Sequence, residues 1–276
     1  MAIAGTPPCR VLRVLTPGLR EEASCPAGHA GAVTPPRWPR RHPVVAALVA
    51  VALVLSAVWG LALLRLARSV ETAASYWSEP RGEPGGLLYV ALGDSAAQGI
   101  GAGRPDRGYV GLLAERLSAR TGRPVEVVNL SRSGARISDV LENQLPALAA
   151  LGRTPDLVTV AIGGNDVPTY EADRFTGSVG ELVDALPAGS YVADVPYWMH
   201  GRWEDDAQAA AVVMTAAARE RGLRPVPLHE AQRRAGWSAM LTQFAADWFH
   251  PDDRGHRLWA DAFWREIEAD LDGADR

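Results

Sequence analysis

A serine, a histidine and an aspartate stand at positions that could together perform nucleophilic acyl transfer. Ser95 follows a short apolar run in Gly93-Asp94-Ser95, and His250 lies in Asp247-Trp248-Phe249-His250-Pro251 near the end of the chain. A serine hydroxyl becomes a nucleophile when a base removes its proton, and histidine is the natural base near neutral pH. A carboxylate three residues upstream can hold Nδ1 and leave Nε2 free for the serine. The pattern predicts a triad of Ser95, His250 and Asp247.

Two further blocks carry groups that could stabilise an oxyanion. The block from Asn129 to Gly134 follows a second apolar run, and Gly163-Gly164-Asn165-Asp166 follows a third. A backbone N–H at a glycine and a side-chain amide can both meet the negative charge of a tetrahedral intermediate. Each block also occurs in ordinary turns, so the interpretation depends on all four blocks standing in this order.

The apolar runs alternate with amphipathic segments at the spacing of βαβ units. Strands are expected at 87–92, 125–128, 157–162, 190–195 and 225–228, and helices at 109–120, 137–151, 207–221 and 252–271. This alternation predicts a mostly parallel sheet covered by helices on both faces, a three-layer α/β/α domain. Sites in such sheets lie at the carboxyl ends of the strands, where the first three blocks begin.

In these four blocks the chain resembles the SGNH/GDSL hydrolase family of esterases, lipases and acyl-transfer relatives, over roughly residues 87–271. Ala96 stands where the family usually has leucine. The resemblance implies a flavodoxin-like SGNH-hydrolase fold and cleavage of carboxylic esters through an acyl-enzyme. It implies an oxyanion hole formed by the backbone N–H groups of Ser95 and Gly134 and the side chain of Asn165. It implies no metal and no organic cofactor, and Asp94 is expected to support the turn.

Several functions stay open at this stage. Acyl transfer to a glycan or lipid hydroxyl would use the same residues as hydrolysis of a small-molecule, glycan or lipid ester. A non-catalytic binding module could share the fold, whereas a nucleotide-binding domain would need a phosphate loop that is missing here. The short interval between Asp166 and Ser190 leaves little room for a large lid and favours small acyl groups. Trp198 and Trp203 are expected on a loop at the end of a strand.

The other histidines show weaker patterns. His256 falls inside the closing helix and is expected on its polar side, and His200 and His229 lack a comparable carboxylate spacing. The glycine-rich segment 99–103 lacks the spacing of a dinucleotide site and is expected to be a flexible loop. No histidine or aspartate cluster has the spacing of a metal site.

An uncharged run of 21 residues, 44–64, precedes the expected domain. About 20 such residues span the roughly 30 Å hydrocarbon core of a bilayer. Arginines are more numerous before the run (Arg37, Arg40, Arg41) than after it (Arg65, Arg68). Because positive charge favours the cytoplasmic side, we expect a single-pass protein of the cell membrane with its domain outside the cytoplasm. A cleaved signal peptide and a secreted domain remain the alternative, with the nearest cleavage site at Thr72-Ala73-Ala74.

Composition bounds the remaining possibilities. The chain has 28 arginines and no lysine, which is typical of a bacterial genome rich in G and C. Residues 1–43 are basic and the remainder is acidic, so we expect no nucleic-acid partner. Cys9 and Cys25 both precede the apolar run, which leaves the domain without a thiol nucleophile. We expect a monomer.

These observations predict four regions. Residues 1–43 form a disordered basic region, 44–64 a transmembrane helix, 65–86 a linker and 87–272 the hydrolase domain.

Overall fold

The computed structural model describes residues 42–198, 201–236 and 238–274. The chain divides into two units, Met1–Leu48 and Val49–Arg276, and the second unit contains the sheet and every site discussed below. The predicted disorder of region 1–43 falls outside the described residues, apart from His42 and Pro43.

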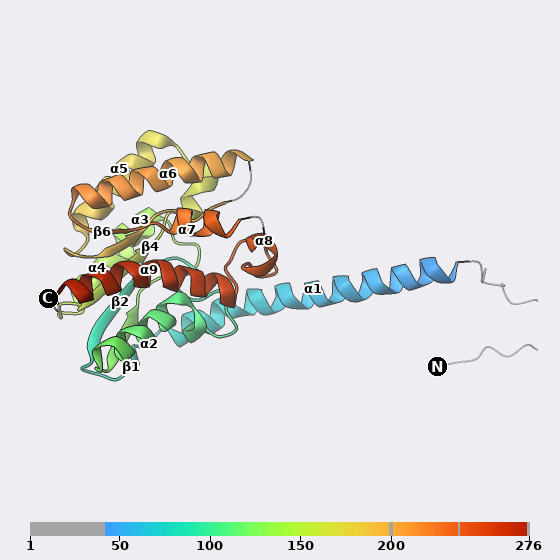
Figure 1. Cartoon of the computed structure of the whole chain (residues 1–276), viewed down its shortest axis with the longest axis horizontal. Coiled ribbons are helices and arrows are strands. Elements are labelled where there is room, and N and C mark those ends of the chain that lie inside the picture. Colours follow the sequence, from blue (N-terminus) through green and yellow to red (C-terminus); the bar gives the residue numbers. More distant parts are fainter. Residues whose placement is uncertain (1–41, 199–200, 237, 275–276) are drawn as a thin grey trace, which may run out of the picture. The chain divides into compact units, whose positions relative to one another are not determined.

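A six-stranded sheet forms the centre of the second unit (Figure 1). Its strands are β1 (Arg81–Gly82), β2 (Leu87–Gly93), β3 (Val125–Asn129), β4 (Leu157–Ala161), β5 (Tyr191–Ala193) and β6 (Arg224–Val226). The spatial order is β1-β3-β2-β4-β5-β6, and all neighbours are parallel except β1 and β3. The five parallel strands have the flavodoxin-like order, whose crevice lies where the order reverses, here between β2 and β4. The predicted fold class is confirmed.

Strand β2 shows why the sheet needs helices on both faces. All seven of its residues are buried. Leu87, Tyr89 and Ala91 belong to one apolar cluster, whereas Leu88, Val90 and Leu92 belong to another. Successive side chains of a strand point to opposite faces, so a continuous apolar run must be covered on both.

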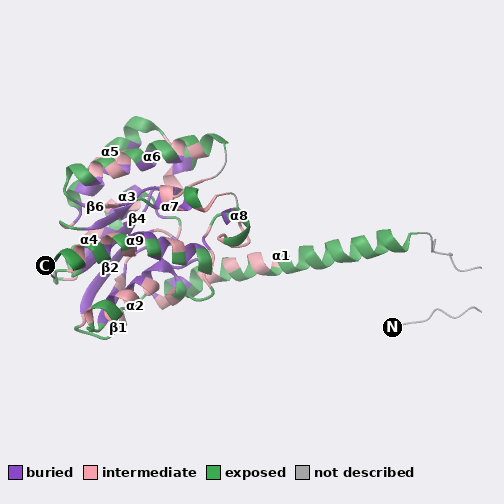
Figure 2. Cartoon of the chain, viewed as in Figure 1, coloured by how far each residue is buried: buried purple, intermediate pink, exposed green. Residues whose placement is uncertain are grey.

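Two groups of helices provide this cover (Figures 1 and 2). One cluster joins the sheet to α2 (Tyr109–Thr121), α7 (Leu228–Ala235) and α9 (Asp253–Ala274). The other joins it to α3 (Ile137–Asp139), α4 (Leu145–Ala150), α5 (Ala172–Ala185) and α6 (Gly201–Glu220). The short helix α8 (Ala239–Thr242) precedes the segment that carries His250. The three layers expected from the sequence are therefore present.

The first helix differs from its prediction. Helix α1 runs without a break over Pro43–Tyr76 instead of ending at Leu64, so most of the expected linker 65–86 is helical. Ala73 and Trp77 are buried in the cluster of α2 and α9, with Leu66 packed against them. These three residues fall on one face of a helix, and their burial explains why the chain stays helical to Tyr76.

The amino-terminal part of α1 is apolar and exposed (Figure 2). Among the described residues, α1 is the one helix long and apolar enough to cross a bilayer, and a signal sequence would satisfy the same criterion. Leu48, Val54 and Leu64 are all exposed. This exposed apolar surface is compatible with a membrane span or with a signal sequence.

Candidate active site

The nucleophile candidate sits on a tight turn at the end of β2. Gly93 has a φ of 150°, and a Cβ there would lie 2.4 Å from the carbonyl oxygen of Ala161, so the turn requires glycine. The side chain of Gln144 accepts a hydrogen bond from the Gly93 N–H and donates one to the Gly93 carbonyl, both at 2.8 Å. Gln144 is buried in a π-helical turn, Val140–Gln144. The backbone at the start of the turn that presents Ser95 is therefore held through both the N–H and the carbonyl of Gly93.

Asp94 supports the same turn, as the sequence led us to expect. Its Oδ1 accepts a hydrogen bond from the Ala96 N–H at 3.0 Å, and its Oδ2 lies 3.4 Å from Nδ2 of Asn165. Burial raises the pKa of Asp94 to about 6, because the hydrogen bond from Ala96 and the nearby His250 offset only part of the desolvation.

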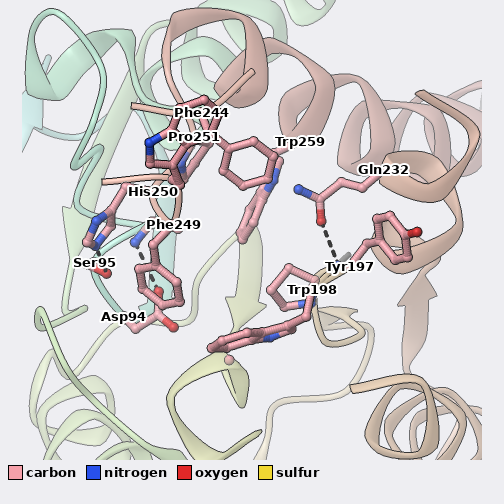
Figure 3. A pocket seen from close by; sticks show the side chains of 14 residues that line it. Asp94, Ser95, Tyr197, Trp198, Gln232, Phe244, Phe249, His250, Pro251 and Trp259 are labelled. Carbon is pink, nitrogen blue, oxygen red and sulfur yellow. Dashed lines mark hydrogen bonds between the residues drawn. The ribbon is translucent and has the colours of Figure 1, made fainter. Parts of the chain in front are cut away.

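His250 and Asp247 meet Ser95 in a chain of hydrogen bonds, of which Figure 3 shows His250 beside Ser95. Nε2 of His250 lies 2.8 Å from Oγ of Ser95, and Nδ1 lies 2.6 Å from Oδ2 of Asp247. Oδ1 of Asp247 also accepts the backbone N–H groups of Phe249 and His250, both at 3.1 Å. The carboxylate thus fixes both the imidazole ring and the backbone that carries it.

The loop around His250 is short and strained. The Ala245 N–H donates to the His250 carbonyl at 2.8 Å, and Phe244 and Pro251 form an isolated antiparallel bridge. At the tip, Trp248 has a φ of 58°, a left-handed conformation that costs a residue with a side chain about 1–2 kcal/mol. Strain of this kind persists where neighbouring contacts over-determine the backbone, as the Asp247 hydrogen bonds do here.

Asp247 stays ionised beside His250. Partial burial pushes its pKa upward, but the hydrogen bond and charge of His250, together with the two backbone N–H groups, outweigh burial and leave the pKa below its usual value. An ionised carboxylate accepts a hydrogen bond from the Nδ1–H group of His250, which leaves Nε2 to accept a hydrogen bond from the Ser95 hydroxyl.

The three expected oxyanion donors differ in their present contacts. Within the described residues, the backbone N–H groups of Ser95 and Gly134 have no hydrogen-bond acceptor. Gly134 adopts a φ of 79°, the conformation for which glycine is favoured. Nδ2 of Asn165 instead donates to the Ala135 carbonyl at 2.9 Å, in addition to its long contact with Asp94. Asn165 would have to exchange one of these contacts for an oxyanion.

Gln98 is a site residue that sequence reasoning missed. Its Oε1 accepts the N–H and hydroxyl of Ser133 at 2.9 and 2.6 Å, and its Nε2 donates to the Ser131 carbonyl at 3.1 Å. Its own carbonyl accepts the indole N–H of Trp77 at 3.0 Å. Gln98 therefore connects the end of α1 to the loop that carries Gly134. No local sequence pattern could predict this role, since every hydrogen-bond partner of Gln98 is distant in sequence.

An aromatic pocket opens beside Ser95 (Figure 3). Its lining combines Asp94, Ser95 and His250 with aromatic side chains from three separate segments, Trp198, Phe244, Trp248, Phe249 and Trp259. Trp198 was expected on a loop at a strand end and does line the pocket, whereas Trp203 packs against Trp198 with ring centres 5.8 Å apart. Trp259, on α9, gave no sequence signal.

One expectation about the surroundings of the site is wrong. His256 is fully buried, not on the polar side of α9; its Nε2 lies 3.0 Å from the Ile100 carbonyl, and burial lowers its pKa to about 4. In the glycine-rich segment 99–103, a Cβ on Gly101 would lie 2.2 Å from the Pro251 carbonyl oxygen, so the backbone of Gly101 lies close against that of Pro251. The segment therefore supports the backbone next to His250.

The structure also bears on the other histidines and on metal binding. His229 has a carboxylate partner after all, Glu204, whose Oε1 lies 3.0 Å from Nε2. This pair comes from different helices, so no local spacing could reveal it. His200 lies outside the described residues. In the part of the chain that the structure describes, no group of histidine, cysteine, aspartate and glutamate side chains could hold a metal ion.

Comparison with known proteins places the chain in a family. Residues 91–258 match the model of the GDSL-like lipase/acylhydrolase family, and the chain belongs to this family. It is therefore a hydrolase of ester bonds. A search of curated proteins found no significant match.

Solved structures share the fold. A catalytic mutant of Axe2, an acetylxylan esterase from Geobacillus stearothermophilus, is 24% identical with a TM-score of 0.55, over 66% of this chain and 94% of that chain. A lipase/acylhydrolase from Enterococcus faecalis is 21% identical with a TM-score of 0.56, over 66% and 95%. TesA is 24% identical with a TM-score of 0.54, over 66% and 98%. At these identities the likeness concerns the fold.

Proposed function

We propose that the protein is a serine esterase that cleaves carboxylic esters through an acyl-enzyme formed on Ser95. The observation that carries this proposal is the hydrogen-bond chain from Ser95 through His250 to Asp247, with both contacts below 3 Å. The histidine lies between the serine and the aspartate, as a base must lie between a nucleophile and the carboxylate that orients the base.

The reaction follows from these contacts. His250 takes the hydroxyl proton at Nε2 while Oγ of Ser95 forms a bond to the ester carbonyl carbon. Asp247 stabilises the imidazolium that results, and His250 then gives the proton to the departing alcohol oxygen. A water molecule, deprotonated by His250, attacks the acyl-enzyme, and Ser95 recovers its proton as the carboxylic acid leaves. The chemistry uses only groups of this chain and water.

The negative charge on the tetrahedral oxygen needs donors aimed at it. The backbone N–H groups of Ser95 and Gly134 are free to act, and Asn165 adds its amide after releasing the long contact with Asp94. Removing one donor of this kind costs about 2.7–4 kcal/mol of transition-state stabilisation. At 3.4 Å the Asp94 contact is the weaker of the two that Asn165 makes, so an oxyanion can replace it while the Ala135 contact keeps the amide in position.

The proposed location is the cell membrane, with α1 as an uncleaved anchor and the domain outside the cytoplasm. Ala73 and Trp77 support this choice over a cleaved signal peptide. Cleavage at Thr72-Ala73-Ala74 would remove Leu66 and the helix around Ala73 from the core. Residues that build the domain are poor candidates for removal.

The test uses the full chain in detergent with p-nitrophenyl esters from acetate to palmitate. The parent should hydrolyse at least part of the series, whereas Ser95→Ala should not, and the preferred chain length would measure the acyl pocket. Adding glycan or lipid alcohols and analysing the products separates hydrolysis from acyl transfer. A folded parent that is inactive on every ester would overturn the proposal. So would a Ser95→Ala variant as active as the parent.

A further inference from the structure

A short apolar segment next to the pocket lies against the anchor helix. It comprises residues 239–249, from α8 to the loop that precedes His250, and we call it the 239–249 segment. In the described part of the domain after α1, five large apolar side chains are exposed, and three of them, Leu241, Trp248 and Phe249, belong to this segment. Its one charged residue is Asp247, which is engaged by His250. Such a cluster marks a contact surface.

One hydrogen bond identifies what the segment faces. The indole Nε1 of Trp59, on α1, donates to the Ala246 carbonyl at 2.9 Å. Both residues belong to the unit Val49–Arg276. Trp59 lies inside the apolar run 44–64, five residues before its end, so the 239–249 segment contacts the part of α1 that the membrane would surround. A carbonyl near lipid needs such a donor, because water is scarce there.

The depth of this contact can be estimated from the arginines that follow the run. Arg65 and Arg68 line an open hollow, a setting that suits lipid phosphate groups. Trp59 precedes Arg65 by six residues, or about 9 Å of helix. The headgroup layer is about 5–8 Å thick. With Arg65 among the headgroups, Trp59 lies near the edge of the hydrocarbon, the depth that tryptophan prefers.

We propose that the 239–249 segment rests in the outer leaflet of the bilayer that holds α1, and that the pocket beside Ser95 takes esters of amphiphiles resident in that membrane. This inference rests on the proposed anchor and esterase activity. Trp248 and Phe249 belong both to the segment and to the pocket lining, so a lipid-soluble ester reaches the pocket along an apolar wall. Leu241 lies outside the lining and serves as a contact with lipid only.

A label on Leu241 tests the membrane contact without using activity. In the full chain with Cys9→Ser and Cys25→Ser, an environment-sensitive dye is attached at Leu241→Cys, and the protein is placed in phosphatidylcholine vesicles. Val212→Cys is the matched control, since Val212 is equally exposed on α6 (65% against 67%). The Leu241 dye should shift to the blue and be quenched by nitroxide-labelled lipids, whereas the Val212 dye should not. Equal behaviour of the two dyes would overturn the proposal.

A second experiment tests the substrate class. Leu241→Asp and Val212→Asp are compared on p-nitrophenyl palmitate dissolved in the vesicles and on p-nitrophenyl acetate in water. Loss of an apolar contact with lipid should reduce turnover of the palmitate about tenfold for Leu241→Asp alone. Turnover of acetate should stay within about twofold for both variants, since neither residue lines the pocket. Equal losses on the two esters would overturn the membrane route.

The two proposals can fail separately. A parent chain that is inactive on both esters, but whose Leu241 dye is quenched by lipid, would overturn the esterase function and support the membrane contact. An active parent whose Leu241 dye behaves like the Val212 dye would support the esterase and overturn the membrane contact. In that case the substrate would reach the pocket from water, as a soluble acetylated glycan would.

Discussion

The two halves of the active site are built in different ways. Ser95 lies on a turn at the end of a fully buried strand, held by Gln144 and Asp94, while Gln98 fixes the neighbouring loop. His250 lies on a partly exposed loop whose backbone hydrogen bonds join residues close in sequence, from Gln243 to Asp252, apart from the bond that Trp59 donates to Ala246. The nucleophile side depends mostly on long-range contacts, and the base side depends mostly on local ones.

This difference shows how such a site can combine fixed geometry with access to substrate. Donors for an oxyanion must be positioned before charge appears, and a buried sheet edge provides that rigidity. The His250 loop is held by its own short-range hydrogen bonds, so its tip can stay exposed while His250 keeps its position. The exposed Trp248 and Phe249 at this tip line the pocket in which we propose that substrate binds.

The largest effect should come from Ser95→Ala. Because no neighbouring group can replace the nucleophile, kcat on p-nitrophenyl acetate should fall by roughly 10⁶-fold, as for other serine hydrolases that lose this residue. Burst-phase kinetics should also vanish, because no acyl-enzyme forms. The melting temperature serves as the control for folding. A residual rate near that of the parent would mean that the chemistry uses another residue.

Asp247→Asn should have the next largest effect and tests the local side. An asparagine amide facing Nδ1 favours the wrong tautomer of His250, and kcat should fall by about 10⁴-fold. Asparagine keeps an oxygen for the N–H groups of Phe249 and His250, so the loop should retain its shape. A loss below about tenfold would show that another group orients His250.

Gln144→Leu tests whether the nucleophile side depends on long-range contacts, and the measurement is the stability of the fold. The substitution leaves the Gly93 N–H unpaired in the interior, which costs about 1–3 kcal/mol, whereas the Gly93 carbonyl keeps the hydrogen bond from the Arg132 N–H. The free energy of unfolding, measured by denaturant titration, should therefore fall by about 1–3 kcal/mol. Gln208→Leu on the exposed face of α6 is the matched control and should change it little. If both variants lose equal stability, the Ser95 turn does not depend on Gln144.

Asp94→Asn tests the nucleophile side through the pH dependence of stability. The pKa of Asp94 is raised to about 6 from a usual value near 4, so the folded state holds this proton more strongly than the unfolded state. Its contribution to stability is present below pH 4 and is lost as pH rises towards 6, by at most about 3 kcal/mol. Relative to the parent, the Asp94→Asn variant should gain stability across this interval. Parallel stability curves would contradict the raised pKa.

The smallest effect concerns the strained residue of the loop. Trp248→Gly and Trp248→Ala both remove the indole, but only glycine adopts a φ of 58° without cost. The glycine variant should therefore be the more stable of the two by about 1 kcal/mol in thermal unfolding. If alanine is equally tolerated, the loop has relaxed to another conformation, and the base side is more adaptable than its hydrogen bonds indicate.

The sequence allowed the residues of the proposed triad to be identified as candidates because they sit in local patterns. Asp247 and His250 are three residues apart on one loop. Ser95 closely follows a strand that could be predicted from a run of apolar residues. The roles of Gly134 and Asn165 came from the family resemblance, and the structure adds that Asn165 is engaged by the Ala135 carbonyl. Such a contact cannot be read from spacing.

Other residues could not be predicted, because their partners are distant in the chain. Gln144 contacts Gly93 across 51 positions, and Trp77 contacts Gln98 from within the segment that was expected to be a linker. Trp259 lines the pocket from the closing helix, where an apolar residue reads simply as core. The error over 65–86 has the same origin, since Ala73 becomes a core residue only when α2 and α9 are in place.

The sequence by itself determined the reaction class, the strand–helix alternation and the apolar run, since each depends on residue types at short, regular spacing. Only the tertiary structure decided which donors are free for an oxyanion, which aromatic side chains form the pocket, and that Trp59 meets Ala246. Those features depend on directed contacts between segments far apart in the chain. Burial fixes such contacts only after the sheet and its two helical layers have assembled.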